Sequence, residues 1–335
     1  MRNDTYDPNP AEGSEVRLGS IKLITNELTI GRDATVEAGK IFMFANESIV
    51  VESGAVIDSL IENECHLRDV QYDLYKCTTE EQDQSHLDFA YIMRYYNEQY
   101  GLSSGDSHYA RHPRDLAKYV MNKWNVYMLS LGELAMTQAR IDGPRIGLCA
   151  NAIAIQDSDI EASGQGCQHD QGLGKGLKSD DCAASGAAHG GQGGYGATGT
   201  LRENEIYAAS CEEHRPEPYY FGHEARYEGS GGGSGDAEKS SGGSGGGVVW
   251  LTTPGTMLLG GTTVAANGRE GRSPEPDQAG SGGGAGGSVQ VMALNLAGAE
   301  SSVEARGGDG SARGGGGGAG GRLIVQLLKS YRADS

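Results

Sequence analysis

The sequence predicts a mainly β protein: a right-handed parallel β-helix whose glycine-rich tracts stack as an ordered polyglycine-type layer, with a small helical insertion. Two observations carry this prediction. Strand-like phrases recur along the chain next to glycine, and only ten of the 55 glycines precede residue 160. Such self-similarity is typical of solenoid proteins, in which each repeat packs on the one before.

The first recurring phrase places a β-branched residue before a small or acidic residue and then glycine. Its full versions are "TTVAANGREG" at 262–271, "SSVEARGGDG" at 301–310 and "SDIEASGQG" at 158–166. Shorter versions are "DATVEAG" at 33–39 and "SIVVESG" at 48–54. We therefore expect these segments to occupy equivalent places in successive coils.

The second phrase runs from glycine directly into a strand. It covers 241–253, 281–293 and 314–326. Its strands begin 40 residues apart between Val248 and Ser288, and 34 apart between Ser288 and Arg322. The repeating unit is therefore a glycine tract, a strand, a short turn and a second strand.

The strand candidates are rich in Val, Ile and Leu, with partial two-residue alternation. They cover 17–30, 39–51, 149–162 and 287–296. Turns such as "GRDAT" at 31–35 are too short for crossover helices, so each strand is expected to pair with its equivalent in the next coil. Parallel crossovers are right-handed as a rule, which sets the predicted hand. The alternative is a β-sandwich with long glycine loops.

The glycine tracts differ from a flexible linker because they return at one position relative to the strands. Equivalent positions of a solenoid stack, so the tracts are expected to lie side by side. Extended glycine chains lack Cβ atoms and can hydrogen-bond to one another in a helix of three residues per turn. Ordering glycine costs about 0.5–1 kcal/mol per residue more than ordering alanine, so many lateral bonds or disulfides are needed. Mobile loops are the alternative.

One glycine tract carries a family resemblance. It contains "ASGAAHGGQGGYG" at 184–196, and later tracts read "GGSGGGVVWLTT" and "GGGGGAGGRLIV". These strings resemble a motif of glycine-rich repeat cell-surface proteins, which include protist surface, adhesive and flagellar-appendage proteins. The resemblance covers about residues 145–335, and 16–58 more faintly. It implies a β-helical fold and a structural or adhesive role at the cell surface.

The predicted organisation is one continuous solenoid domain that carries an insertion. Residues 1–62 form the first coils, 63–125 a helical or irregular insertion, and 126–335 the glycine-rich coils. Helical periodicity predicts helices at 85–101 and 112–124. The insertion is interpreted as a brace for the solenoid or as a partner surface, because tyrosines are frequent in interfaces. The tyrosine candidates are Tyr91, Tyr95, Tyr96, Tyr100 and Tyr109.

The cysteines form an even set without a CxxC pair, which favours disulfides over a zinc site. They are Cys65, Cys77, Cys149, Cys167, Cys182 and Cys211. Spacing leaves their pairing open: Cys65 and Cys77 could close a loop, while Cys167 and Cys182 flank the first glycine tract.

Composition and sequons point to an extracellular or cell-surface setting. Asn3 and Asn46 lie in glycosylation sequons, and the net charge is −18. Residues 1–15 lack the apolar segment of a signal peptide, which argues against an extracellular setting. The acidity argues against a nucleic-acid partner, since phosphate binding needs clustered Lys and Arg. No apolar run reaches 18 residues, so no membrane span is expected.

The search for chemistry finds few candidates. "GLGKGLKS" at 172–179 lacks the spacing of a phosphate-binding loop. His189 is expected to pack or hydrogen-bond at a turn, and His214 and His223 to lie in a surface loop. "GGDG" at 307–310 leaves calcium open, although the iterated Asp spacing of calcium repeats is missing. No cofactor is expected.

An enzyme would need carboxylates that converge on one strand face, because polysaccharide cleavage uses such groups. Asp157, Asp159 and Glu161 alternate along one predicted strand and are the candidates, but a solvated outer face explains them equally well. The sequence therefore predicts a structural, non-enzymatic protein that builds or decorates a surface fibre by self-assembly or with other fibre proteins. An adhesin-type module that binds glycans or a receptor is the alternative, and a carbohydrate-active enzyme is less favoured.

Overall fold

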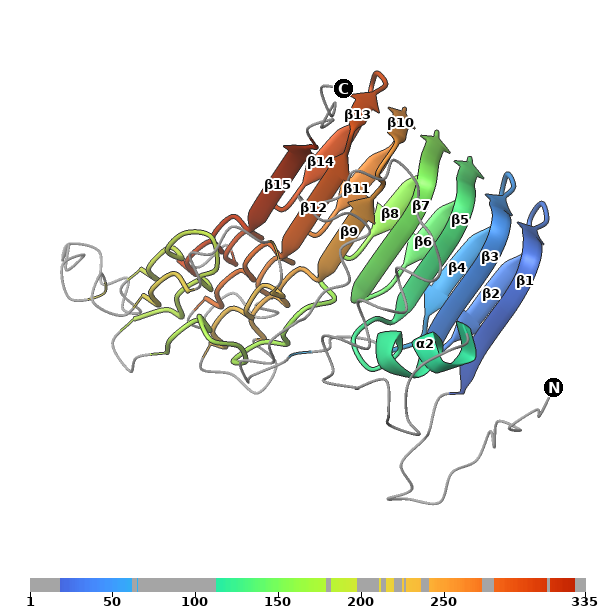
Figure 1. Cartoon of the computed structure of the whole chain (residues 1–335). Helices are drawn as coiled ribbons and strands as arrows, with labels where there is room; N and C mark the ends of the chain where they lie inside the picture. The colour runs from blue at the N-terminus through green and yellow to red at the C-terminus, as the bar shows by residue number, and fades with distance from the viewer. Residues whose placement is uncertain are drawn as a thin grey trace, which may run out of the picture.

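The fold is described from a computed structural model of the chain. It describes residues 19–61, 65, 113–178, 182–197, 211, 215–219, 225, 227–235, 241–272, 280–311 and 314–328. Within these residues the protein is mainly β, and its strands form two parallel sheets (Figure 1). The arrangement is compatible with a β-solenoid, although neither sheet curls.

The wide sheet holds the longer strands. In spatial order it contains β1 (Ser20–Ile30), β3 (Lys40–Val51), β5 (Val126–Thr137), β7 (Arg145–Gln156), β9 (Val248–Thr252), β12 (Ser288–Ala293) and β15 (Arg322–Leu327). Beside this path, β10 (Thr256–Gly260) pairs with the second half of β7 and with β13 (Asn295–Ala297). The two short strands therefore prolong the layers of β9 and β12.

The narrow sheet faces the wide one and follows the same order. It contains β2 (Thr35–Ala38), β4 (Val56–Ser59), β6 (Arg140–Asp142), β8 (Asp159–Glu161), β11 (Thr263–Ala265) and β14 (Ser302–Glu304). The chain alternates between the sheets, so each wide-sheet strand and the narrow-sheet strand that follows it form one layer (Figure 1).

Side chains line up from layer to layer because the pairings between the strands are parallel and keep their register, apart from one irregularity in the β1–β3 pairing and one in the β5–β7 pairing. In the narrow sheet, Ile57, Ile141 and Ile160 are consecutive partners. Facing rows of the wide sheet include Met43, Met128 and Leu148. All are buried in one apolar core between the two sheets. This core removes a continuous strip of aliphatic surface from water, which is the main favourable contribution to folding.

The outer face of the wide sheet is also covered, as is usual for parallel sheets. Helix α2 (Pro113–Val120) lies over its first strands (Figure 1). Leu116 and Val120 belong to the same buried cluster as Phe42 and Phe44 of β3. The helix predicted at 112–124 is therefore present over part of that range, whereas the one predicted at 85–101 lies outside the described residues.

The turns between the sheets share one left-handed backbone position. Strand register aligns residues with positive φ there, namely Asp33 (55°), Gly54 (78°), Gln138 (46°), Asp157 (47°), Gly261 (59°) and Glu300 (59°). Their amides join successive layers; the Asp157 N–H, for example, donates to Gly260 O at 2.7 Å. Glycine adopts this conformation without strain, and a Cβ on Gly54 would lie 2.0 Å from Asp33 Oδ1.

The recurring phrases have different outcomes. The strands predicted to be equivalent at Val248, Ser288 and Arg322 are direct register partners, which confirms the second phrase. Four copies of the first phrase supply β2, β8, β11 and β14 of the narrow sheet. The fifth copy, "SIVVESG" at 48–54, was wrongly aligned. It ends β3 in the wide sheet, because hydrophobic alternation alone does not distinguish the two sheets.

Candidate functional site: the glycine array

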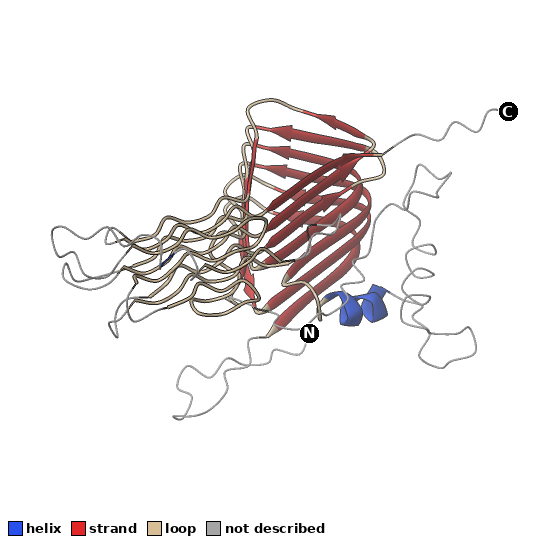
Figure 2. Cartoon of the chain, turned by 90° about the vertical axis from the view of Figure 1, so that its left-hand side faces the viewer, coloured by secondary structure: helices blue, strands red, loops and turns tan. Residues whose placement is uncertain are grey.

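The glycine tracts lie side by side to one side of the two sheets (Figure 2). We call them together the glycine array: residues 164–177, 183–197, 229–235, 241–247, 266–271, 280–287, 305–311 and 314–321. Three tracts enter β9, β12 and β15 directly, so the strand register fixes the heights at which they leave the sheets.

The tract at 280–287 donates its amides outward in three directions. Amides three residues apart reach the same neighbouring tract, at 2.7–2.9 Å. The donor and acceptor residues are Gly282 to Gly233 and Ala285 to Ser230, Gly283 to Gly316 and Gly286 to Ala319, and Gly284 to Arg269 and Gly287 to Ala266.

The same tract accepts hydrogen bonds from three further neighbours, at 2.9–3.0 Å. The donor and acceptor residues are Gly243 to Gly282 and Gly246 to Ala285, Ala184 to Gly280 and Ala187 to Gly283, and Ser311 to Ser281 and Gly308 to Gly284. Six tracts therefore surround this one. The three-residue period is that of an extended helix that has no hydrogen bonds of its own, so its backbone groups are satisfied by neighbours.

Close packing of backbones explains why the residues are glycine. A Cβ on Gly282, Gly284 or Gly287 would lie 1.9–2.1 Å from a backbone oxygen of a neighbouring tract. In the outermost tract, a Cβ on Gly317 or Gly320 would have no atom closer than 3.8 Å. The array is therefore intolerant of side chains inside and tolerant at its surface.

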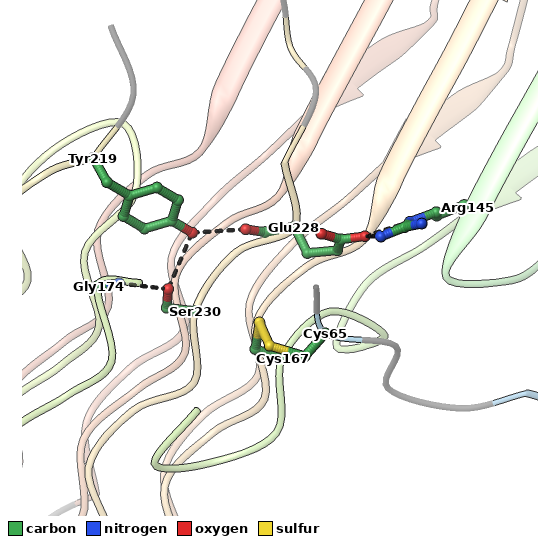
Figure 3. Close-up of a disulfide and its surroundings, with 7 residues drawn as sticks. All are labelled: Cys65, Arg145, Cys167, Gly174, Tyr219, Glu228 and Ser230. Atoms are coloured by element: carbon green, nitrogen blue, oxygen red, sulfur yellow. Dashed lines mark hydrogen bonds and ion pairs between the residues drawn. A yellow bond between two sulfur atoms is a disulfide. The ribbon is translucent and has the colours of Figure 1, made fainter. Parts of the chain in front are cut away.

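A buried ion pair joins the array to the wide sheet. Arg145 of β7 contacts Glu228, and their side chains are only 3% and 2% exposed (Figure 3). The Tyr219 hydroxyl donates to the Glu228 backbone carbonyl at 2.7 Å, and Ser230 Oγ donates to the Tyr219 oxygen at 3.0 Å. Ser230 Oγ also accepts from the Gly174 amide at 3.0 Å. Burial raises the pKa of the Tyr219 hydroxyl, so it remains a neutral donor.

His189 extends the lateral hydrogen bonding with its side chain. Its ring is fully buried, and Nδ1 lies 2.7 Å from Gly286 O. The Ala187 amide donates to Gly283 O, so the side chain of His189 continues the three-residue period of the backbone hydrogen bonds. Because a carbonyl can only accept, Nδ1 carries the proton. The ring stacks on Tyr219 at 4.9 Å, and Nε2 has no hydrogen-bond partner within the described part of the chain.

The environment of His189 disfavours its charged form. Burial lowers the pKa of His189, the Gly286 hydrogen bond opposes this shift and the nearby Arg322 charge adds to it, and the resulting pKa is about 4. The imidazole is therefore neutral at physiological pH. The hydrogen-bonding role expected from the sequence agrees with this geometry.

Disulfides anchor two of the tracts. Cys167 of the array is bonded to Cys65, 102 residues away (Figure 3). Cys182 is bonded to Cys211. The loop considered between Cys65 and Cys77 is therefore wrong, because Cys65 has a distant partner. Cys149 is also disulfide-bonded. Sequence spacing carried no signal for these long-range pairs.

A Ser–His–Asp cluster at the surface of the array was not foreseen. His169 Nδ1 lies 3.1 Å from Ser234 Oγ and 3.2 Å from Asp170 Oδ2. A hydrolytic triad uses different ring nitrogens for the serine and the carboxylate, whereas here Nδ1 faces both. Burial opposes ionisation of Asp170, but hydrogen bonds from the Ser234 hydroxyl and amide keep its pKa lowered. The cluster joins the turn at His169 and Asp170 to Ser234, which lies 64 residues further along the chain than Asp170.

The acidic candidates lie on the outer side of the narrow sheet. Asp159 and Glu161 share a face of β8, but Asp157 lies in the preceding turn and not on the strand as expected. A nearby hollow of about 310 Å³ is bordered by Asp58, Arg140, Asp142 and Arg269 among others. Its Arg140 guanidinium is already paired with Asp142 at 2.8 Å. Within the described residues, no group of three His, Cys, Asp or Glu side chains is placed to hold a metal ion.

Other candidates are placed as follows. Asn46 is exposed on β3, where its Nδ2 donates to Asn26 Oδ1 at 2.7 Å. The described residues do not include Asn3, Cys77, His214, His223 or the tyrosines Tyr91, Tyr95, Tyr96, Tyr100 and Tyr109. No helix in the described part of the chain is long and apolar enough to cross a membrane.

Comparison with family models, curated proteins and solved structures gives no match. The geometry of the glycine array therefore carries the functional interpretation.

Proposed function

We propose that this protein is a structural extracellular protein that forms or decorates a cell-surface fibre. In this proposal the two sheets are a right-handed parallel β-helix, and the array is a polyglycine-type layer that stiffens one side of it. The function is mechanical: lateral hydrogen bonds between many chain segments resist bending and shear.

The lateral network around residues 280–287 is the observation that carries the proposal. Backbone groups of this tract bond to six other tracts, and side chains are excluded from its interior. A linker or a mobile loop has no need of such packing, because its backbone is satisfied by water. Disulfides at Cys167 and Cys182 add covalent anchors of a kind that persists in oxidising compartments.

Negative-stain electron microscopy of the purified full chain tests the proposal. We expect filaments of uniform width in the wild-type protein. Gly284→Val should abolish them, because the Cβ of the new side chain would lie only 2.1 Å from the backbone oxygen of Ser244. Gly320→Val is the matched control and should leave them intact, because its Cβ has 3.9 Å of space. Discrete wild-type particles at all concentrations would overturn the fibre role.

A further inference from the structure

The two sheets end at different heights after the last glycine tract. In the described residues the wide sheet ends at β15, while the narrow sheet ends one layer earlier, at β14. Leu323, Val325 and Leu327 of β15 are 50%, 56% and 61% exposed. Their register partners Val289, Val291 and Ala293 are buried core residues. The core rows therefore continue onto β15, and no narrow-sheet strand of the described residues lies opposite them.

The rows of inward-facing aliphatic side chains that end on β15 begin on β1, in the first layer. Strand register connects Ile21 through Ile41, Val126, Ile146, Val249 and Val289 to Leu323. The next row connects Leu23 in the same way to Val325. Because all strands are parallel, the free edge of β1 can pair with the free edge of β15 and keep the strand direction and register of the sheet. Both ends thus present aliphatic side chains at matching positions.

The sequence before β1 repeats the pattern of a narrow-sheet strand. Residues 15–21 read "EVRLGSI", residues 35–41 read "TVEAGKI" and residues 140–146 read "RIDGPRI". In the latter two, the inward narrow-sheet residue comes five positions before the first inward residue of the next wide-sheet strand. Val16 stands in the same relation to Ile21. The Gly39 amide donates to Gly19 O at 2.9 Å, so the alignment holds up to residue 19.

Charge gives an independent indication. The position after the inward residue is acidic in most narrow-sheet strands, with Glu37, Asp58, Asp142, Glu161 and Glu304 in one row. In the segment before β1 the equivalent residue is Arg17. Like charges on neighbouring strands repel, and a cation in this row is favourable. Glu304 is the last acidic residue of the row in the described chain; its side chain is 20% exposed and accepts hydrogen bonds from Arg306 and Asn267.

We propose that the face formed by β14 and β15 binds the first layer of a second copy of this chain. Residues 15–18 of the second copy add a strand beside β14 and fill the missing half-layer, and its β1 pairs in parallel with β15. Arg17 then lies between Glu304 of one copy and Glu37 of its own. This inference rests on the proposed fibre function and names the joint by which the fibre grows.

The joint is heterologous, and because it continues the stack of parallel layers in one direction, we expect it to repeat into a filament and not to close into a ring. The order of strands across the joint is the same as the order within one copy. The wide-sheet strand β15 is followed by the narrow-sheet segment at 15–18 of the second copy and then by the wide-sheet strand β1 of that copy. The main-chain hydrogen bonds give affinity, and the aliphatic rows Ile21 to Leu323 and Leu23 to Val325 set the register.

Two blocked variants of the full chain test the joint by sedimentation velocity and native mass spectrometry. Val325→Lys blocks the face at β15, and Val16→Lys blocks the segment before β1. Val325 is already 56% exposed in the single chain, so its replacement should leave the fold intact by circular dichroism. Each lysine should weaken the joint at least about 100-fold, because burial of an unpaired ammonium is costly. Leu258→Lys, at a 46% exposed residue of β10, is the matched control and should assemble like wild type.

The expected result is that each blocked variant alone is monomeric, while a 1:1 mixture forms a heterodimer and nothing longer. A dimer of Val16→Lys alone would overturn the proposal in favour of contact between two β15 faces. Filaments that persist in both variants would place the joint elsewhere and leave the fibre function standing. A heterodimer of the two variants together with closed wild-type rings in place of filaments would support the joint and contradict the fibre function. A monomeric wild type would overturn both.

Discussion

The sheets and the glycine array are two solutions to one problem, that of holding parallel layers of chain together. In the sheets, neighbours bond on two sides, and alternate side chains such as Met43 and Ile141 fill an apolar core. In the array, the tract at 280–287 bonds to six neighbours, and side chains are nearly absent. The sheets are therefore stabilised mainly by apolar burial, and the array by backbone hydrogen bonds and by its anchors.

This difference teaches where each region is vulnerable. A sheet core loses stability when side chains are removed, because a cavity remains. The array loses stability when side chains are added, because backbones are already in contact. The net stabilisation from each hydrogen bond of the array is modest, and ordering glycine is entropically unfavourable. The stability of the array therefore depends strongly on its attachment to the sheets.

The largest expected effect comes from cutting this attachment. Glu228→Gln leaves the buried Arg145 without its counter-charge, and we expect a loss of about 3–5 kcal/mol in the free energy of unfolding. Urea denaturation followed by circular dichroism measures it. Asp142→Asn, at the more exposed pair with Arg140, is the control and should cost less than about 1 kcal/mol. Equal losses in both variants would show that the buried pair does not anchor the array.

The second expected effect is a pH dependence that belongs to the array. The pKa of His189 is about 4 in the folded protein and 6.5 ordinarily. Between these values the unfolded chain binds a proton that the folded chain does not, so stability is full above pH 6.5 and declines as pH falls to 4. The loss is on the order of 3 kcal/mol. Unfolding free energies at a series of pH values measure it.

His189→Asn should flatten that profile between pH 6.5 and 4, since the amide can still donate to Gly286 O without titrating. A slope that survives in His189→Asn would assign the titration to another group.

The smallest expected effect sharpens the rule on side chains in the array. A Cβ on Gly318 would lie 2.0 Å from Gly284 O, whereas one on the neighbouring Gly317 would lie 3.8 Å from its nearest atom. Gly318→Ala should cost about 1–3 kcal/mol through overpacking. Gly317→Ala should be neutral or slightly stabilising, because alanine restricts the unfolded chain. Thermal unfolding of the two variants compares them directly, and equal melting temperatures would contradict close packing of this tract.

Much of the architecture was readable from the sequence because it repeats. Alternation in segments such as 287–296 predicted strands, and the spacing of Val248, Ser288 and Arg322 predicted which strands pair. The phrase at 48–54 misled because the end of β3 and the narrow-sheet strands share the same composition. Asp157 was placed on a strand because alternation continues through the left-handed turn that it occupies.

By itself, the sequence determined the local repeats. Side chains alternate every two residues in the strands, the tracts consist mainly of glycine, and the recurring phrases return from layer to layer. Such periods follow from the geometry of the backbone and need no knowledge of partners. Only the tertiary structure decided which distant groups meet, such as Arg145 and Glu228, 83 residues apart, and Cys65 and Cys167. It also decided which glycines are irreplaceable. Gly317 and Gly318 are neighbours in the same glycine run, so the sequence does not distinguish them, whereas their contacts in space do. The reason is that contact between tracts depends on the height at which each leaves the sheets, and that height is set by strand register.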